Sequence, residues 1–272
     1  MSEGRIPALG AIFLWGLLAA LAVRLSSIPP FLLTGVALLV GSLVGVRSLL
    51  SRPPPASALA LGVYGLFGFH FFLFLALRRA PPVEANLVNY LWPLLIVLLA
   101  PLLVPGVRWS ALHALAALLG FGGAALLIGS SAERLGQGEL LGYAFAAASA
   151  LIWSTYSLMT RRFSHFPTAY VAWFCLASGA ASLACHFAFE PRHVPAASEW
   201  PWLVALGLGP MGAAFYLWDR ALKRGDPRSI GNLAYLTPLL STLVLVLAGA
   251  GTLGPIALVA MTMILAGAYL GR

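Results

Sequence analysis

An amide, two polar-tipped aromatic rings and a proline lie together in the stretch NYLWP, which interrupts an apolar run. Asn86, Asn89, Tyr90 and Pro93 follow the spacing i, i+3, i+4, i+7, so they share one face of a helix, and Trp92 lies at the edge of that face. Amides in hydrocarbon are costly unless they meet polar partners or water. We therefore predict that Asn86, Tyr90 and Trp92 line a wet, substrate-binding cavity. The alternative is that the amides join neighbouring helices by hydrogen bonds.

Other apolar runs contain four further candidates for the same cavity. His70 lies in GLFGFHFFLF, and an ionisable side chain inside a membrane span is by default a candidate for function. Trp153 and Tyr156 lie well inside ASALIWSTYSLMT, away from the membrane interface that such residues prefer. Tyr235 is the counterpart of Tyr90 in a repeat described below. The alternatives are a histidine that serves only the structure and aromatic side chains that only pack.

Three prolines are predicted to form hinges. Pro93 and Pro238 follow a tyrosine in the related stretches YLWPLL and YLTPLL, and Pro210 lies among glycines in GLGPMG. A proline inside a helix removes one backbone hydrogen bond and bends the chain. A carrier that opens alternately to the two sides of a membrane needs such bending points.

Acidic side chains are scarce, which limits the chemistry that the chain can perform. It contains only eight Asp and Glu residues, and none is expected at the centre of an apolar run. A proton or sodium relay usually requires such a carboxylate. The sequence also lacks a nucleophile–base pair at a plausible spacing, a phosphate-binding loop and a metal-ligand motif. We therefore predict a carrier without cofactor or metal, and not an enzyme.

Composition places these residues in a lipid bilayer. The 272-residue chain is 61% hydrophobic and 9% charged, whereas soluble domains are about half apolar and a quarter charged. We predict an all-α integral membrane protein. Its ten expected spans lie at residues 6–23, 30–47, 57–77, 84–103, 109–129, 138–160, 167–188, 200–221, 229–249 and 253–271. The net charge of +8 is scattered over short loops and forms no basic face, so no nucleic-acid partner is expected.

The placement of Lys and Arg predicts the orientation. With the N-terminus in the cytoplasm, eleven of the sixteen Lys and Arg residues fall on the inner side and five on the outer side. Cytoplasmic loops carry an excess of these residues. Both termini are therefore expected in the cytoplasm, and Arg78 and Arg79 are expected on the outer side.

An internal repeat predicts the architecture. Displaced by 145 residues, ALRRAPPVEANLVNYLWPLL (76–95) matches ALKRGDPRSIGNLAYLTPLL (221–240) at nine of twenty positions, and LWG (14–16) resembles IWS (152–154). The chain then consists of two five-helix repeats, residues 1–132 and 133–272. Because five is odd, the second repeat enters the membrane in the opposite sense. Such inverted repeats are common in transporters, with the binding site near the midplane between the halves.

These motifs resemble the EamA-type drug/metabolite transporter superfamily, and the resemblance covers nearly the whole chain. VNYLWPLLIVL is similar to the corresponding helix of the YddG-type exporters of aromatic amino acids. The resemblance implies export from the bacterial cytoplasm across the inner membrane. It also implies functional roles for His70, Trp92 and Trp153. The group's tyrosine before this histidine is replaced here by Phe69, which removes its hydroxyl.

The predicted cavity suits a zwitterion with a large apolar side chain. Asn86, Tyr90 and His70 are expected to bind the head group, and Trp92 and Trp153 to pack against the side chain. We predict facilitated export by alternating access, with amino acids as substrates and membrane lipids as surroundings; nothing in the sequence calls for a second copy. The rival hypotheses are export of drugs or other metabolites, and a membrane scaffold or lipid-modifying enzyme.

Overall fold

The computed structural model describes residues 3–80, 82–129, 140–247 and 254–271, and all regular elements in these ranges are helical. The helices of the first half are α1 (Arg5–Gly16), α2 (Leu18–Arg24), α3 (Pro30–Ser42), η1 (Leu43–Gly45), α4 (Val46–Leu49), α5 (Ala56–Val63), η2 (Tyr64–Gly68), α6 (Phe69–Leu77), α7 (Pro82–Asn89), α8 (Trp92–Leu103) and α9 (Ala111–Gly129). Those of the second half are α10 (Leu140–Arg162), η3 (Thr168–Tyr170), α11 (Val171–Phe189), α12 (Trp200–Leu208), η4 (Gly209–Ala213), α13 (Ala214–Arg224), α14 (Pro227–Ala234), α15 (Leu236–Leu247) and α16 (Pro255–Leu270).

Helices that follow one another with at most two residues between them join into longer segments, except that the extended residues Gly225 and Asp226 keep α13 and α14 apart. In the described ranges each such segment overlaps one of the predicted spans, so the helical part of the prediction is confirmed. Four of the segments, 30–49, 56–77, 168–189 and 200–224, are long and apolar enough to cross a membrane. Whether the remaining segments also cross it stays a prediction.

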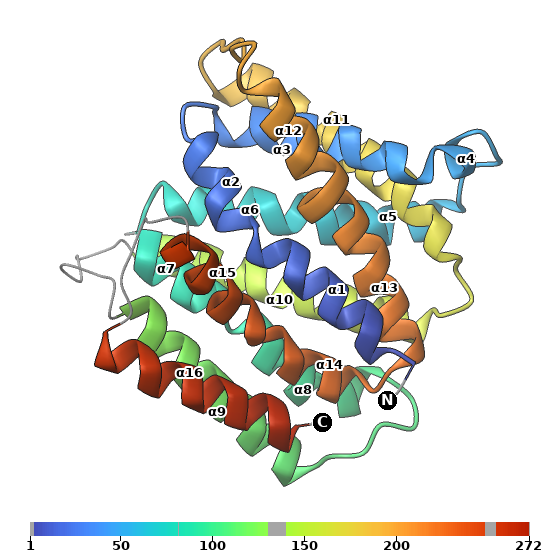
Figure 1. The fold of residues 1–272 in the computed structure, drawn as a ribbon. Coiled ribbons are helices and arrows are strands. Elements are labelled where there is room, and N and C mark those ends of the chain that lie inside the picture. The colour runs from blue at the N-terminus through green and yellow to red at the C-terminus, as the bar shows by residue number, and fades with distance from the viewer. Residues whose placement is uncertain (1–2, 81, 130–139, 248–253, 272) are drawn as a thin grey trace.

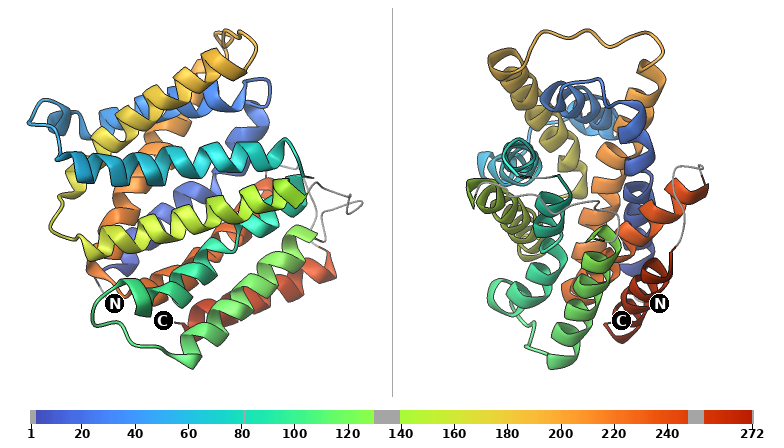
Figure 2. Two further views of the ribbon diagram at one scale, coloured as in Figure 1. Left: turned by 180° about the vertical axis from the view of Figure 1, so that it is seen from behind. Right: turned by 90° about the vertical axis from the view of Figure 1, so that its left-hand side faces the viewer.

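The segments pack side by side without being parallel: α12 and α13 run steeply in Figure 1, whereas α3 and α6 run nearly level (Figures 1 and 2). Both chain ends lie at the same end of the bundle, and the turns from α2 to α3 and from α6 to α7 lie at the opposite end (Figure 1). Extensive packing joins α9 to α16, α3 to α11, α6 to α10 and α1 to α13. The last pair brings the N-terminal helix against a helix of the second half.

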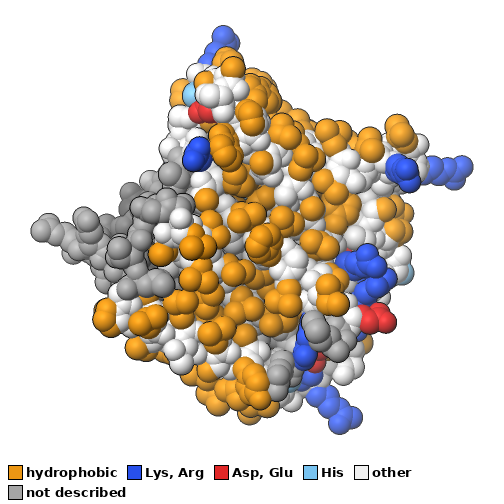
Figure 3. Space-filling view, viewed as in Figure 1, with side chains coloured by type: hydrophobic (Ala, Val, Ile, Leu, Met, Phe, Trp, Pro, Cys, Tyr) orange, Lys and Arg blue, Asp and Glu red, His pale blue; other side chains and the backbone are white. Residues whose placement is uncertain are grey.

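Apolar side chains cover much of the outside of the bundle. Phe13, Leu115, Leu118 and Leu265 are each more than half exposed. In Figure 3 hydrophobic side chains cover the middle of the visible face, while most Lys and Arg side chains lie toward its edges. Soluble monomers rarely expose apolar surface of such extent, so this distribution fits a bilayer surrounding.

Backbone irregularities recur at the predicted repeat distance. The π-helical turns η2 and η4 begin at Tyr64 and Gly209, 145 residues apart, and the same displacement relates the bounds of α7 and α14. The helix that follows each of the latter begins beyond a break at Tyr90–Leu91 or at Tyr235. The 145-residue repeat is therefore visible in the backbone as well as in the sequence.

The predicted hinge prolines all lie at these irregular places. Pro93 is the second residue of α8, where a proline costs no hydrogen bond, so it starts a helix instead of bending a continuous one. Pro238 lies in the first turn of α15, directly after the break at Tyr235. Pro210 lies inside η4. Bending at these positions during transport stays a prediction.

Candidate functional site

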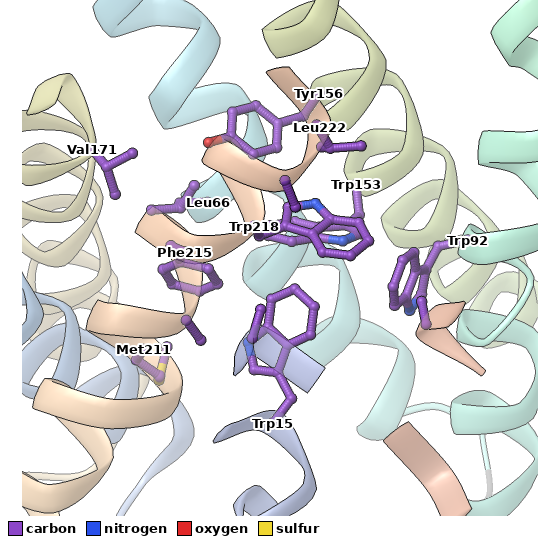
Figure 4. Packing of buried hydrophobic residues seen from close by; sticks show 14 of the residues in the cluster. Trp15, Leu66, Trp92, Trp153, Tyr156, Val171, Met211, Phe215, Trp218 and Leu222 are labelled. Atoms are coloured by element: carbon purple, nitrogen blue, oxygen red, sulfur yellow. The ribbon is translucent and has the colours of Figure 1, made fainter. Parts of the chain in front are cut away.

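Four tryptophan rings from four helices meet in the centre of the bundle (Figure 4). Trp15 of α1 lies edge-on to Trp92 of α8 and Trp153 of α10, with ring centroids 6.2 and 5.9 Å apart. Trp218 of α13 lies 5.2 Å from Trp15 and 5.6 Å from Trp92. All four are at most 8% exposed. These four residues, called the tryptophan cluster below, unite the two halves of the chain.

Two indole N–H groups of the cluster hold it in place. Trp15 Nε1 donates to the carbonyl of Pro210 at 3.1 Å, and Trp218 Nε1 donates to Ser157 Oγ at 3.0 Å. Among the described residues neither Trp92 nor Trp153 donates its indole N–H to a protein acceptor. Hydrogen bonds therefore hold two of the four rings, Trp15 and Trp218, in place.

His70 lies in the first turn of α6, directly after the π-helical turn η2. Its Nδ1 is 2.6 Å from the carbonyl oxygen of Leu66. A carbonyl only accepts, so Nδ1 carries the proton, and in a neutral ring Nε2 is then an acceptor. The neighbouring Phe69 contacts both the His70 ring, at 5.0 Å, and the Trp153 ring, at 5.3 Å. Phe69 thus connects the histidine to the tryptophan cluster.

The polar residues of α7 divide between the two roles considered from the sequence. Asn89 is buried, and its Oδ1 accepts a hydrogen bond of 2.7 Å from Ser149 Oγ of α10. This is an interhelical hydrogen bond, as the structural alternative expected. Asn86 and Tyr90, by contrast, are only half-buried. His70, in the first turn of α6, is half-buried as well. Deep side chains that keep accessible surface are typical of a cavity lining.

The remaining predicted residues are fully enclosed. Tyr156 packs on the Trp153 ring at 5.4 Å, at the edge of the tryptophan cluster. Tyr235 is 0% exposed and lies in a second hydrophobic cluster with Leu94 and Ile264, where its ring covers Gly120. The structure therefore groups Trp92, Trp153 and Tyr156 together and leaves Tyr235 outside this group.

The two ends of the bundle differ in their open space. At the end opposite to the termini a cavity of about 300 Å³ lies between the α2–α3 turn and α6. At the end with the termini, the space beside Thr160 and Asp219 is about 10 Å³, which is at most room for one water. Asp219 is buried there between Lys223 Nζ at 2.7 Å and Thr168 Oγ1 at 2.5 Å. The described cavities are thus wide at one end only.

Sequence reasoning missed several residues of this centre. Trp218 and Phe215 were not distinguished from ordinary apolar residues of their helix, yet Phe215 lies 5.7 Å from Trp153 and 6.3 Å from Trp15. A signal for Trp15 was present, because LWG and IWS were recognised as echoes. The tryptophans of these two motifs, Trp15 and Trp153, lie in ring contact. Glu190 lies directly after α11, outside any helix, and its side chain is nevertheless buried.

Comparison with known proteins gives the class. The chain matches the EamA-like transporter family twice, over residues 3–129 and 140–271, and it belongs to that family. The fold and the site therefore belong to a transporter.

Two relatives carry more specific names. A protein of Ancylobacter novellus named aromatic amino acid exporter YddG is 49% identical over 248 residues, which are 88% of this chain and 86% of the relative. A Salmonella typhimurium protein of the same name is 27% identical over 255 residues, 89% of this chain and 79% of the relative. A solved crystal structure superposes with a TM-score of 0.94 at 45% identity, covering 99% of this chain and 95% of the other.

Proposed function

We propose that this transporter carries aromatic and other large apolar amino acids out of the cell by alternating access. The observation that carries the proposal is the tryptophan cluster, which Phe69 connects to the half-buried His70. Aromatic walls suit an aromatic side chain, and a few polar groups suit a zwitterionic head group. The names of the two relatives support the same substrate class.

The proposal includes a topology. The chain crosses the bacterial inner membrane ten times, as two inverted repeats formed by residues 1–132 and 133–272, with both termini in the cytoplasm. The common end of the two termini in Figure 1 supports an even number of crossings, and the excess of Lys and Arg on that side supports its cytoplasmic placement. The recurrence of π-helical turns at 145 residues supports the repeat.

The roles of the side chains follow from their hydrogen-bonding capacity. Nε2 of His70 accepts a hydrogen bond from the substrate ammonium, because Nδ1 is already engaged. Asn86 and Tyr90, four residues apart and so on one shared face, offer additional polar groups. The indole N–H groups of Trp92 and Trp153 are donors suited to the substrate carboxylate, while their rings pack against its side chain. Tyr156 supports Trp153 from behind.

In this conformation the two ends of the bundle differ in open space. The wide cavity lies at the end opposite to the termini, which the proposed topology makes the outer side. On the inner side the tryptophan cluster and the Asp219–Lys223 pair fill the space. For export, the helices that carry the tryptophan cluster and the Asp219–Lys223 pair must separate on the inner side. Bending at Pro93, Pro210 and Pro238 allows this separation. Transport is facilitated, since Asp219 is engaged by a lysine and lies near the inner end.

The test is uptake of labelled tryptophan, phenylalanine, threonine and alanine into proteoliposomes containing the purified chain. Trp153→Ala and His70→Ala are compared with wild type. Trp109→Ala is the matched control, because Trp109 is 61% exposed and lies between α8 and α9, outside the tryptophan cluster. We expect saturable flux that favours the two aromatic substrates. Both central variants lose at least tenfold in kcat/KM, and the control does not.

Two results would contradict parts of the proposal. Flux of none of the four solutes would remove the amino-acid assignment and favour drugs or other metabolites as substrates. Uptake that rises with an imposed proton gradient would replace facilitated transport by proton coupling. His70 is the side chain to change first in that case.

A further inference from the structure

The outer cavity contains an arginine that the central site does not use. The cavity of about 300 Å³ has the volume of a small-molecule site, and its lining is apolar apart from Ser26 and Arg78. Leu33 of α3 and Phe74 and Leu77 of α6 form part of its walls. Arg78 caps the C-terminus of α6 and keeps 44% of its side chain exposed. A single cation beside apolar walls is complementary to an amino acid with an apolar side chain.

The Glu190 carboxylate contacts Arg78 and has three other hydrogen-bond partners. The buried Glu190 side chain accepts hydrogen bonds from the backbone N–H groups of Phe31 at 2.9 Å and Leu32 at 3.2 Å, and His186 Nδ1 lies 2.9 Å from it. Arg78 Nη2 approaches Glu190 Oε1 at only 3.3 Å, the longest of the four contacts. If Arg78 moves away, three partners still hold the carboxylate.

The remaining capacity of Arg78 fits a carboxylate. A guanidinium has five N–H donors in a planar fork that matches a carboxylate with two parallel hydrogen bonds. The described contacts engage Nη2 with Glu190 and place the guanidinium carbon 5.9 Å from the centre of the Phe31 ring. A substrate carboxylate can therefore bind Arg78 while the cation stays stacked above Phe31.

A row of side chains on α6 leads from His70 to the outer cavity. His70, Phe74 and Arg78 are spaced by four residues, so they lie on one face of the helix. The His70 and Phe74 rings are 6.1 Å apart, and Phe74 also lines the outer cavity. His70 and Arg78 are separated along the axis by about 12 Å. One amino-acid head group cannot contact both, so the two positions define successive sites.

We propose that Arg78 and this cavity form an outer binding site for the carboxylate of the amino acid as it leaves. The inference rests on the proposed function and extends it by a second station. An amino acid released from the central cluster moves along Phe74. Its carboxylate then binds Arg78 in competition with Glu190, and its side chain lies against Leu33 and Leu77.

The test separates carboxylate recognition from general damage. Entry of labelled tryptophan from the outer face is measured in right-side-out vesicles, with tryptamine as inhibitor because it keeps the ring and the ammonium but lacks the carboxylate. Arg78→Gln is expected to raise the KM for tryptophan about tenfold, while the inhibition constant of tryptamine changes less than twofold. Arg78→Lys keeps the charge and is expected to raise KM about threefold. Arg79→Gln is the matched control, since Arg79 does not line the cavity.

Three outcomes would overturn the proposal. An unchanged KM for tryptophan in Arg78→Gln would show that the arginine binds something else, such as a lipid phosphate, or nothing. Equal changes for tryptophan and tryptamine would indicate a structural effect. The same loss in Arg79→Gln would indicate a general requirement for outer charge. If Arg78→Gln fails to fold, Arg78→Lys decides by the same comparison. Failure of the wild type to carry tryptophan at all would instead overturn the proposed function.

Discussion

The π-helical turns η2 and η4 occupy equivalent places in the two halves but form different contacts. A π-helical turn displaces the backbone hydrogen bonds of its helix, and such turns are frequent at functional sites. At η2 the carbonyl of Leu66 is bound by His70, four residues further along the same helix. At η4 the carbonyl of Pro210 is bound by Trp15, which comes from the other half of the chain.

The side chains that follow the two turns differ in the same way. His70 corresponds to Phe215 under the displacement of 145 residues. His70 is half-buried, while Phe215 is buried against Trp15 and Trp153. A repeated backbone thus places a half-buried histidine after the turn in the first half. In the second half it places Phe215 and Trp218 against Trp15, a contact between the halves that is called the clamp below. The repeat conserves the irregular geometry, and the individual residues break its symmetry.

The largest expected effect concerns the clamp. Trp218 is 1% exposed, so Trp218→Ala leaves a large void and is expected to lower the free energy of unfolding by about 3–5 kcal/mol. Leu73 occupies the equivalent place in the first half and is only half-buried. Leu73→Ala is therefore expected to cost about 1 kcal/mol or less. Thermal unfolding in detergent, followed by size-exclusion chromatography, measures both variants. Equal losses would mean that the two halves are packed alike and would end the comparison.

The second prediction makes the two turns chemically equal. His70→Phe places after η2 the residue type that follows η4, because Phe215 is the counterpart of His70. The change removes an acceptor for the substrate ammonium. A hydrogen bond to a charged group contributes about 1.5–3 kcal/mol, so kcat/KM for tryptophan should fall roughly 10- to 150-fold. Proteoliposome uptake measures the change, and the elution profile checks folding. His165→Phe is the control, because His165 lies in an exposed turn. Full transport by His70→Phe would show that the side chain after η2 does not bind the substrate ammonium.

The sequence predicted the helical scaffold better than the centre. The 145-residue match, read from RR-P…YL-PLL, agrees with the bounds of α7 and α14 because Pro and Gly limit helices locally. The separation of Tyr90 from Tyr235 was not predictable in this way. The two residues follow the same motif, yet Tyr235 is covered by α9 through Gly120 while Tyr90 keeps accessible surface. Tertiary packing decides between them, and a repeat alone carries no information about it.

The tryptophan cluster illustrates the same limit. Trp92 and Trp153 were predicted from their depth within apolar runs, which is a property of one helix. Trp218 belongs to the cluster because α1 and α13 pack together, and that contact joins residues about two hundred positions apart in the chain. Likewise Glu190 follows α11 as a loop residue would, but folds back onto the N-terminus of α3.

The third prediction tests the clamp at its hydrogen bond. Trp15→Phe keeps an aromatic ring in the cluster but leaves the Pro210 carbonyl without its donor. An unsatisfied buried acceptor costs about 1–3 kcal/mol, and we expect a loss of stability in this range. Trp200→Phe is the matched control, because Trp200 is 44% exposed. Thermal unfolding in detergent compares the two variants. Equal stability of both would mean that water or a backbone shift provides the Pro210 carbonyl with another hydrogen bond. The turn η4 would then need no donor from Trp15.

The smallest expected effect lies at the start of α14. Asp226 caps this helix by accepting from the backbone N–H of Arg228 at 2.8 Å. Burial alone would raise the pKa of Asp226, but hydrogen bonds and charge from Arg228 outweigh it and lower the pKa. The equivalent position in the first half is Pro81, which lies outside the described residues. This ionic cap therefore distinguishes the second half.

The sign of the pH dependence follows from the lowered pKa. The folded state binds this proton less readily than the unfolded state, so the stabilisation is fully present above the unfolded pKa of about 3.9 and is lost as the pH falls through the folded value. Asp226→Asn keeps a capping oxygen without the charge, so it should be less stable by about 1 kcal/mol or less at pH 7, and the difference should shrink toward pH 3. Unfolding temperatures of both proteins at the two pH values measure this, with Glu3→Gln as the control at an exposed position. A difference that persists undiminished at pH 3 would show that Asp226 acts by shape and not by charge, and the second half would then differ from the first in packing alone.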